Sequence, residues 1–267
     1  MDLLKRNMAP IPAAAWTEID REATRVLKTR LSARKFVDVD GPHGPAYTSV
    51  NLGRLAMPGN QNMAPEGVGY GIYQVQPLVE CRIPFELNIW ELDNLMRGAD
   101  PVNLDPVATA AEKAASFEDR VVFNGLQEAG IVGIQQNPNH DPIPMGSDDN
   151  ALLNAISRGI LVLQDAVVEG PYALIAGSSP WRRLASHLQG YPLYRHVERL
   201  IGGPVIYSPV IDHAFLVSLR GGDLVLTLGQ DFALGYESNT AESVRLFLME
   251  SFTFRVLDPA VIVMLQS

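Results

Sequence analysis

Cysteine, long apolar runs and excess positive charge are all scarce in this chain. Cys81 is the only cysteine among 267 residues, so neither an internal disulfide nor a metal site of paired cysteines can form. We therefore expect a reducing cytosol. The first ten residues lack the continuous apolar stretch of a signal peptide, and no apolar run is long enough to cross a bilayer. We expect a protein that is neither exported through such a signal nor inserted into a membrane.

The charge balance is acidic. Lysine and arginine together number 21 against 30 aspartates and glutamates, which gives a formal net charge of −9. This excess argues against a protein that coats nucleic acid by neutralising phosphates. The hydrophobic share of 47% is enough for a sizeable core in one large domain or two small ones.

Helix and strand patterns alternate along the chain. Apolar residues at three- and four-residue steps predict an amphipathic helix over about 12–33. A start signal at 105–106 and Gly130 as a stop predict a long helix over 105–129. Shorter helices are predicted over 147–168 and from about 179 and 192, and short apolar runs between and after them predict strands. The fold class is therefore mixed α/β, in the α+β sense.

Residues 46–79 form a distinct segment. Two strand-forming stretches, 47–55 and 70–79, flank a polar tip rich in glycine and proline. A two-stranded ribbon is only marginally stable alone in water. We therefore predict an extended arm that lies on a neighbouring subunit.

The sequence pattern shows no set of residues that could come together as a catalytic site. The five histidines never fall four apart on one helix as a metalloprotease pair would, and 177–180 lacks the Gly-x-Ser-x-Gly spacing of a nucleophile turn. The glycine-rich stretch 67–71 has no lysine with which to hold a phosphate. We predict no catalytic residue and no metal site.

Two pairs of adjacent carboxylates, at 118–119 and 148–149, also fall on predicted helices. Neighbouring helix positions diverge, so neither pair faces a shared substrate. We expect the first pair to lie on a solvated helix face. We expect the second pair to lie in the first turn of its helix, where negative charges interact favourably with the helix dipole.

Many short strings, spread over nearly the whole chain, resemble the encapsulin family of shell proteins, which are related to the major capsid proteins of tailed bacteriophages. They follow one another in the family's order: LLKR at 3–6, AP at 9–10, WTEID at 16–20, RKFVDV at 34–39, GP at 41–42, WELDNL at 90–95, RG at 97–98, FED at 117–119, GPY at 170–172, GYPL at 190–193, RGGD at 220–223, LGQD at 228–231, GY at 235–236 and VRL at 244–246.

The resemblance implies a Hong-Kong-ninety-seven-type phage capsid fold with three parts. The peripheral domain would comprise 1–45, 80–134 and 223–267, the extended arm 46–79 and the axial domain 135–222. It also implies a shell subunit rather than an enzyme, located in a cytoplasmic encapsulin nanocompartment. The homo-oligomer would be icosahedral, and we expect sixty copies as the smallest arrangement.

The resemblance further implies a guest held inside the shell through a short targeting peptide. The guest would be a ferritin-like protein or a dye-decolorising peroxidase, with a role in iron storage or oxidative-stress defence. The corresponding peptide-binding positions are Leu27, Arg34 and Asp38, with Leu234 and Tyr236 as weaker candidates. The alternative is that Leu27 belongs to the helix core and that Arg34 and Asp38 pair with each other.

Two further sites follow from the resemblance. A five-fold pore corresponds to Ser186, His187, Leu188, Gln189 and Gly190, where a ring of histidines would titrate near neutral pH; the alternative is a surface histidine without a gating role. A flavin in some shells of the family corresponds to Arg82, Trp90 and Tyr191. The indole could equally be an ordinary core or interface aromatic, and no cofactor is required for the shell itself.

Two other functions compete with a nanocompartment. A phage or prophage major capsid protein shares the fold but packages a genome, although the acidic charge and the encapsulin-like amino-terminal helix argue against it. A soluble α/β enzyme is disfavoured because no catalytic set converges. For the shell itself we therefore expect neither nucleic acid nor a membrane as partner.

Overall fold

The computed structural model describes residues 3–57, 69–185, 187–188 and 191–266. The helices are α1 Ala13–Arg30, α2 Ile89–Met96, α3 Asp105–Asn124, α4 Asp149–Asp165, α5 Ser178–Leu184 and α6 Leu193–Ile201, and short 3-10 turns lie at 6–8, 33–35, 127–129, 134–136 and 259–261. The strands are β1 Asp38–Asp40, β2 Ser49–Ala56, β3 Ile72–Pro77, β4 Val79–Asn88, β5 Ile143–Pro144, β6 Tyr172–Ala176, β7 His187–Leu188, β8 Tyr191–Pro192, β9 Val205–Tyr207, β10 Ala214–Ser218, β11 Leu224–Leu228, β12 Ala233–Asn239, β13 Ser243–Val256 and β14 Ile262–Gln266.

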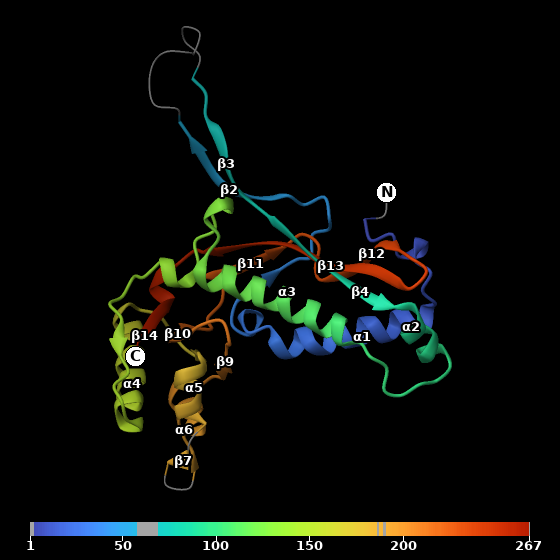
Figure 1. Cartoon of the computed structure of the whole chain (residues 1–267). Coiled ribbons are helices and arrows are strands. Elements are labelled where there is room, and N and C mark those ends of the chain that lie inside the picture. The colour runs from blue at the N-terminus through green and yellow to red at the C-terminus, as the bar shows by residue number, and fades with distance from the viewer. Residues whose placement is uncertain (1–2, 58–68, 186, 189–190, 267) are drawn as a thin grey trace.

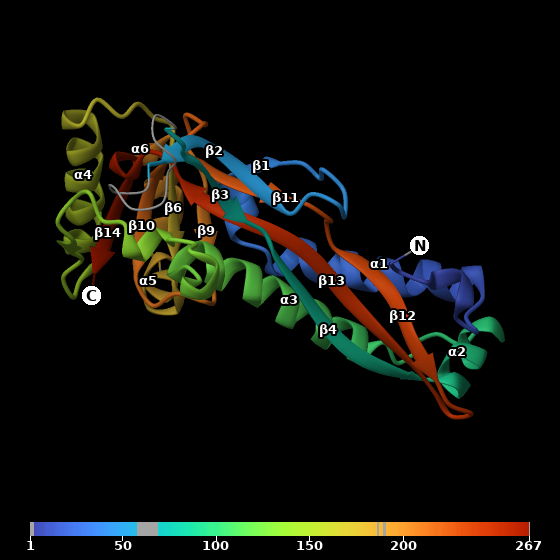
Figure 2. The same cartoon turned by 90° about the horizontal axis from the view of Figure 1, so that it is seen from above.

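Two sheets organise these elements. In the first sheet the long strand β13 pairs antiparallel with β4, β11 and β12, and β1 joins β11 in parallel. Helices α1 and α3 run along this sheet (Figures 1 and 2). The second sheet has the order β5-β14-β10-β6-β9, and α4, α5 and α6 pack against it.

Helix α3 connects the two halves of the core. Its first turns carry Val107, Ala111 and Ala114 into a cluster with α1 and the first sheet. Its last turn carries Val122 and Phe123 into the cluster around the second sheet. One helix therefore contributes to both clusters.

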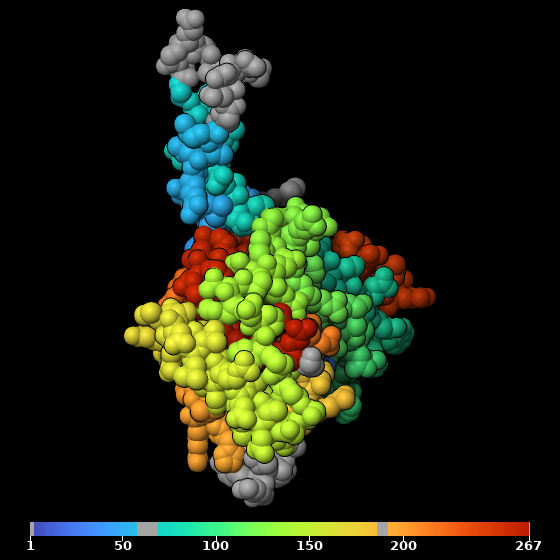
Figure 3. Space-filling view, turned by 90° about the vertical axis from the view of Figure 1, so that its left-hand side faces the viewer, coloured from blue at the N-terminus to red at the C-terminus, as the bar shows by residue number. Residues whose placement is uncertain are grey.

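The ribbon β2–β3 leaves the body of the molecule (Figures 1 and 3). Its strands pair antiparallel, with Leu55 opposite Tyr73 and Asn51 opposite Val75. The predicted pair of strands around 46–79 is thus confirmed for the described residues. The tip, 58–68, lies outside them.

One predicted boundary was wrong. The long helix ends at Asn124, not at 129, because Gly125 takes a φ of 75° and closes it; residues 127–129 form a separate 3-10 turn before Gly130. The strand β14, which belongs to the stretch 223–267 that the resemblance assigns to the peripheral domain, pairs with β10 and β5 in the second sheet. The pairing of a C-terminal strand is set by distant partners, which local periodicity does not report.

We predict that Gly125→Ala destabilises the subunit by at least about 1 kcal/mol, because it forces a side chain into positive φ and close contact. A Cβ atom there would lie 2.5 Å from the carbonyl oxygen of Ile131. Gly130→Ala is the matched control, since Gly130 has a φ of 64° and open space around it. Thermal unfolding should show a larger loss for the first variant. Equal losses would mean that the close approach contributes nothing.

Candidate functional site

Helix α1 and the segment that follows it form one wall of the candidate site. The buried residues of α1, among them Trp16, Ile19, Ala23 and Leu27, recur at helical spacing and pack on α3 and the first sheet. After Arg30 the chain leaves the helix at Leu31, whose backbone is extended, and then makes the 3-10 turn 33–35. This turn places Arg34 over the end of α3.

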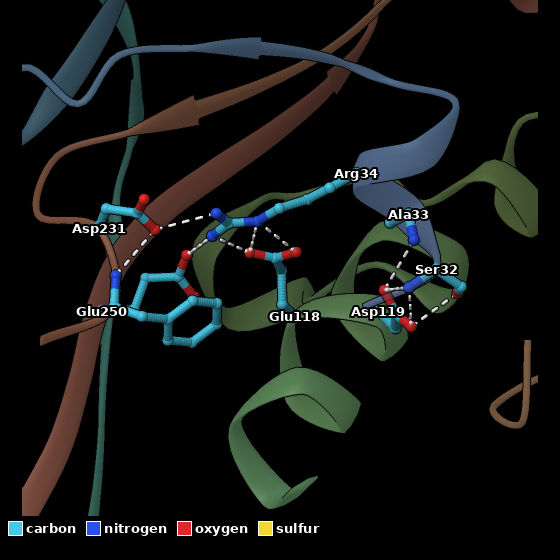
Figure 4. A network of polar contacts seen from close by, with 8 residues as sticks. Ser32, Ala33, Arg34, Glu118, Asp119, Asp231 and Glu250 are labelled. Atoms are coloured by element: carbon cyan, nitrogen blue, oxygen red, sulfur yellow. Dashed lines mark hydrogen bonds and ion pairs between the residues drawn. The ribbon is translucent and has the colours of Figure 1, made fainter. Parts of the chain in front are cut away.

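Asp119 of α3 fixes that turn. Its carboxylate, 1% exposed, accepts hydrogen bonds from the backbone N–H groups of Ser32 and Ala33 at 3.0 and 2.9 Å and from the Ser32 hydroxyl at 2.6 Å. Burial raises the pKa of Asp119 to about 6, although these hydrogen bonds lower it. The interaction anchors the end of α1 to α3 (Figure 4).

Arg34 lies at the centre of a buried charge cluster that also contains Glu118, Glu250 and Asp231 (Figure 4). Its Nε donates to both oxygens of Glu118 at 3.1 and 2.9 Å, and its Nη2 donates to Glu118 Oε2 at 2.6 Å and to Glu250 Oε1. Its Nη1 donates to Asp231 Oδ1 at 2.9 Å. Both glutamates are 0% exposed, whereas Asp231 is 41% exposed.

One guanidinium faces two fully buried carboxylates in this cluster. Burial and then the negative charge of Glu118 raise the pKa of Glu250 well above its usual range. Burial alone would lower the pKa of Arg34, but the hydrogen bonds and charge of Glu118 raise it above its ordinary value. This shift favours the protonated form of Glu250, whereas Glu118 forms the bidentate pair with the arginine. Cys81, opposite Glu250 on β4, has its pKa raised to about 12, chiefly by burial.

The sequence analysis was wrong about the first carboxylate pair, since Glu118 and Asp119 are buried and not on a solvated face. They do diverge as predicted, one toward Arg34 and β13 and the other toward the turn at 32–33. Glu250 and Asp231 were missed altogether. A signal for Glu250 existed, because it is the only charged residue in the apolar stretch 246–254 of β13.

A surface groove of about 370 Å³ lies between α1 and the chain that leads into β12. Its apolar lining comes from Leu27, Leu31 and Phe232. Arg34 and Asp231 also line it, and the arginine lies 4.8 Å from the centre of the Phe232 ring. Thr24, Lys28 and Lys35 complete the lining. The arrangement offers an apolar floor beside a rigidly held polar pair.

The structure brings two of the five predicted peptide-binding residues together in this groove, Leu27 and Arg34. Asp38 does not line this groove; it accepts a hydrogen bond at 2.6 Å from Gly222 and lines a second cleft, which Arg34 also lines. Leu234 is buried in the core with Leu27, and the backbone N–H of Tyr236 donates to Leu4 at 2.8 Å. The alternative pairing was wrong, because Arg34 pairs with Glu118, Glu250 and Asp231 and not with Asp38.

The predicted pore residues are only partly described. Ser186, Gln189 and Gly190 lie outside the described residues, while the backbone at His187 and Leu188 forms β7, which pairs antiparallel with β8 at Tyr191 and Pro192. This hairpin is at the end of the second-sheet half, below α5 and α6 in Figure 1.

The predicted flavin positions do not converge within one chain. Arg82 stacks 4.3 Å from the Phe247 ring and pairs with Glu80. Trp90 is 66% exposed on α2, so it is not a core aromatic. Tyr191 belongs to the β7–β8 hairpin, far from α2 (Figure 1). A site made of all three would need neighbouring copies.

In residues 3–57, 69–185, 187–188 and 191–266, no three or more His, Cys, Asp and Glu side chains gather as a metal site would require. Within the same ranges, every helix is too short or too polar to pass through a membrane.

We predict that the folded protein loses stability as the pH rises, because Glu250 is then driven to ionise while buried. A carboxyl whose pKa is raised on folding stabilises the fold below its unfolded pKa, and this contribution is lost as the pH rises through the raised value. Between the unfolded pKa and the raised folded pKa the loss is about 1.4 kcal/mol per pH unit, and above the folded pKa it levels off. Glu250→Gln stays neutral, so its melting temperature should fall less between about pH 6 and about pH 9 than that of the unmodified protein.

Glu237→Gln on the neighbouring strand is the control, because Glu237 forms an exposed pair with Arg245. It should follow the unmodified protein at every pH. If Glu250→Gln did so too, Glu250 would already be ionised in the folded protein.

Comparison with known proteins gives a consistent result. A family model described as "Encapsulating protein for peroxidase" matches residues 1–253. The type 1 encapsulin shell protein of Rhodospirillum rubrum is 42% identical over 264 residues, which cover 97% of this chain and 94% of that protein.

Two solved structures share the fold. The virus-like particle from Pyrococcus furiosus matches with a TM-score of 0.67 at 17% identity, over 94% of this chain and 98% of that one. The capsid of Myoviridae phage XM1 matches with a TM-score of 0.58 at 12% identity, over 88% and 91%. The predicted phage capsid fold is thereby confirmed. The chain belongs to the encapsulin family of shell proteins, which are structural proteins rather than enzymes.

Proposed function

We propose that sixty copies of this chain close into an icosahedral shell in the cytoplasm and hold a guest enzyme on the inner wall by a tail peptide bound in the groove beside Arg34. The observation that carries this proposal is the projecting ribbon in a chain of a shell-forming family. The family's description names a peroxidase as the enclosed protein, which favours an oxidative-stress role. A ferritin-like guest and iron storage form the second candidate.

The three parts implied by the family have counterparts in the fold. We assign the first sheet with α1, α2 and α3 to the peripheral domain and the ribbon at 46–79 to the extended arm. Residues 135–222 form most of the second sheet and its helices, and we assign them to the axial domain. The pairing of β14 with β10 adds residues 262–266 to that domain.

The ribbon exposes apolar side chains that a lone chain leaves in water. Tyr73 is 70% exposed and Ile72 60%, and Leu55 and Val75 are each about half exposed. Tyr73 and Val75 are two residues apart on one strand and therefore share a face. Covering such surface on a neighbour contributes about 25 cal/mol per Å², so many modest contacts add up around a closed shell.

We predict that Tyr73→Asp prevents shell closure, because it places a charge on the apolar face of the arm. Size-exclusion chromatography and electron microscopy should find small folded species in place of cages. Gln74→Asp adds the same charge to the opposite face of the same strand and should assemble normally. Cages of full size and stability from Tyr73→Asp would show that this face is not an intersubunit contact.

The guest can be identified directly. Particles purified from the source cells should contain one abundant second protein by mass spectrometry, a peroxidase or a ferritin-like protein, and little nucleic acid by absorbance. A packaged genome would instead support the phage capsid alternative.

We predict that Leu27→Asp gives intact but empty shells when shell and guest are coexpressed, because the charge removes an apolar anchor from the groove floor. Since Leu27 is also part of the core, Thr24→Trp is a second variant that fills the groove from an exposed position of α1. Thr17→Trp, exposed on the same helix outside the groove, is its control. Guest content relative to shell is read from gels of purified particles. Full loading of both groove variants would rule out this groove as the guest site.

A further inference from the structure

We propose that Arg34 and Asp231 bind the main chain of the guest peptide as a donor and acceptor pair, and that Glu118 and Glu250 are positioning residues for this pair. The inference rests on the proposed guest groove and deepens it. Recognition would then require an extended peptide with apolar side chains but no particular polar side chain opposite Arg34.

Four of the five N–H groups of Arg34 are engaged within the chain. A guanidinium has five N–H groups in one plane. Nε uses its one hydrogen on Glu118, Nη2 uses two on Glu118 and Glu250, and Nη1 uses one on Asp231. One N–H remains, on the nitrogen that is next to Asp231, and Arg34 lines the groove with 18% of its side chain exposed.

Asp231 supplies the complementary group. Its Oδ1 accepts from Arg34 at 2.9 Å and from the N–H of Phe232 at 2.8 Å. Its Oδ2 accepts no hydrogen bond from the described residues, and the side chain is 41% exposed in the groove. A free donor and a free acceptor therefore adjoin each other. An extended peptide presents the same combination, a C=O and an N–H on one edge.

The charges of the cluster argue against Arg34 as a receptor for a carboxylate of the peptide. Glu118 lies within hydrogen-bond distance of both Nε and Nη2 and already balances the guanidinium charge. A peptide carboxylate would gain little from a cation that is neutralised in this way. A neutral main-chain carbonyl needs only the remaining N–H.

The buried glutamates hold the pair in its orientation. Glu118 is on α3 and Glu250 on β13, two elements that pack together, and the Phe232 ring lies beside the guanidinium. The planar group is thus fixed by its edges and its face, so little side-chain entropy is lost when a peptide binds. Neither glutamate is exposed, so neither can contact the guest itself.

The experiment uses intact shells coexpressed with a fluorescent protein fused to the tail of the guest found in native particles. Each tail position is changed in turn to proline, which removes the main-chain N–H and remains compatible with an extended chain, and to alanine as the matched control. In unmodified shells we expect one position at which proline lowers loading about tenfold more than alanine, the worth of one well-placed hydrogen bond.

Shells that carry Asp231→Ala should load the unchanged tail only as well as unmodified shells load the tail with proline at that position. In these Asp231→Ala shells, proline and alanine at that tail position should give equal loading. Glu250→Ala should behave like Asp231→Ala although it touches no peptide. Glu250→Gln, which still accepts from Arg34, should restore normal loading and the sensitivity to proline. Electron microscopy of each variant confirms that cages form.

The inference is overturned if proline and alanine are equivalent at every tail position in unmodified shells. It is also overturned if Asp231→Ala loads normally while Leu27→Asp and Thr24→Trp shells are empty, since the groove would then bind the guest by side chains alone. Full loading of the last two variants would instead remove the proposed guest site.

Discussion

The neutralisation of one arginine by buried carboxylates is the interaction on which the site depends. Arg34 joins the segment after α1 to Glu118 of α3 and Glu250 of β13, which are distant in sequence. Desolvating so many charges is costly unless each finds a partner. A single guanidinium cannot balance both glutamates, and burial together with the charge of Glu118 raises the pKa of Glu250, which favours its neutral form. The cluster thus constrains three elements to one arrangement, and the groove forms at its exposed edge.

Elsewhere the same chain leaves apolar surface exposed to solvent. Buried apolar residues of the same chain surround α3, whose two ends belong to two hydrophobic clusters. The described residues of the ribbon, by contrast, include the exposed Tyr73 and Ile72, and none of them belongs to either cluster. A rigid body combined with an uncovered arm is the arrangement expected of a subunit whose stability is completed by its neighbours. In the function that we propose, shell formation and guest capture use separate surfaces, the arm for one and the α1 groove for the other.

Local pattern was sufficient for much of this fold. The amphipathic spacing of α1, the start of α3 and the two strands of the ribbon were predicted from residue types and turn signals and agree with the structure. The errors concern distant partners. Gly125 ends α3 because the backbone at 131–133 packs closely against it, and Glu118 is buried because β13 and the turn at 33–35 cover it. Neither neighbour is visible in the sequence around the residue.

The candidate site, too, could be predicted only in part from the sequence. Leu27 and Arg34 were predicted only through the family resemblance, which transfers positions but not roles. A free arginine beside an apolar groove suggests a receptor for an acidic group. The observed arginine has four of its five N–H groups engaged, and its charge is matched. The one remaining N–H is on Nη1, the nitrogen that donates to Asp231, and both side chains line the groove. Because the buried glutamates determine that orientation, the chemistry of the exposed groove follows from residues that no ligand touches.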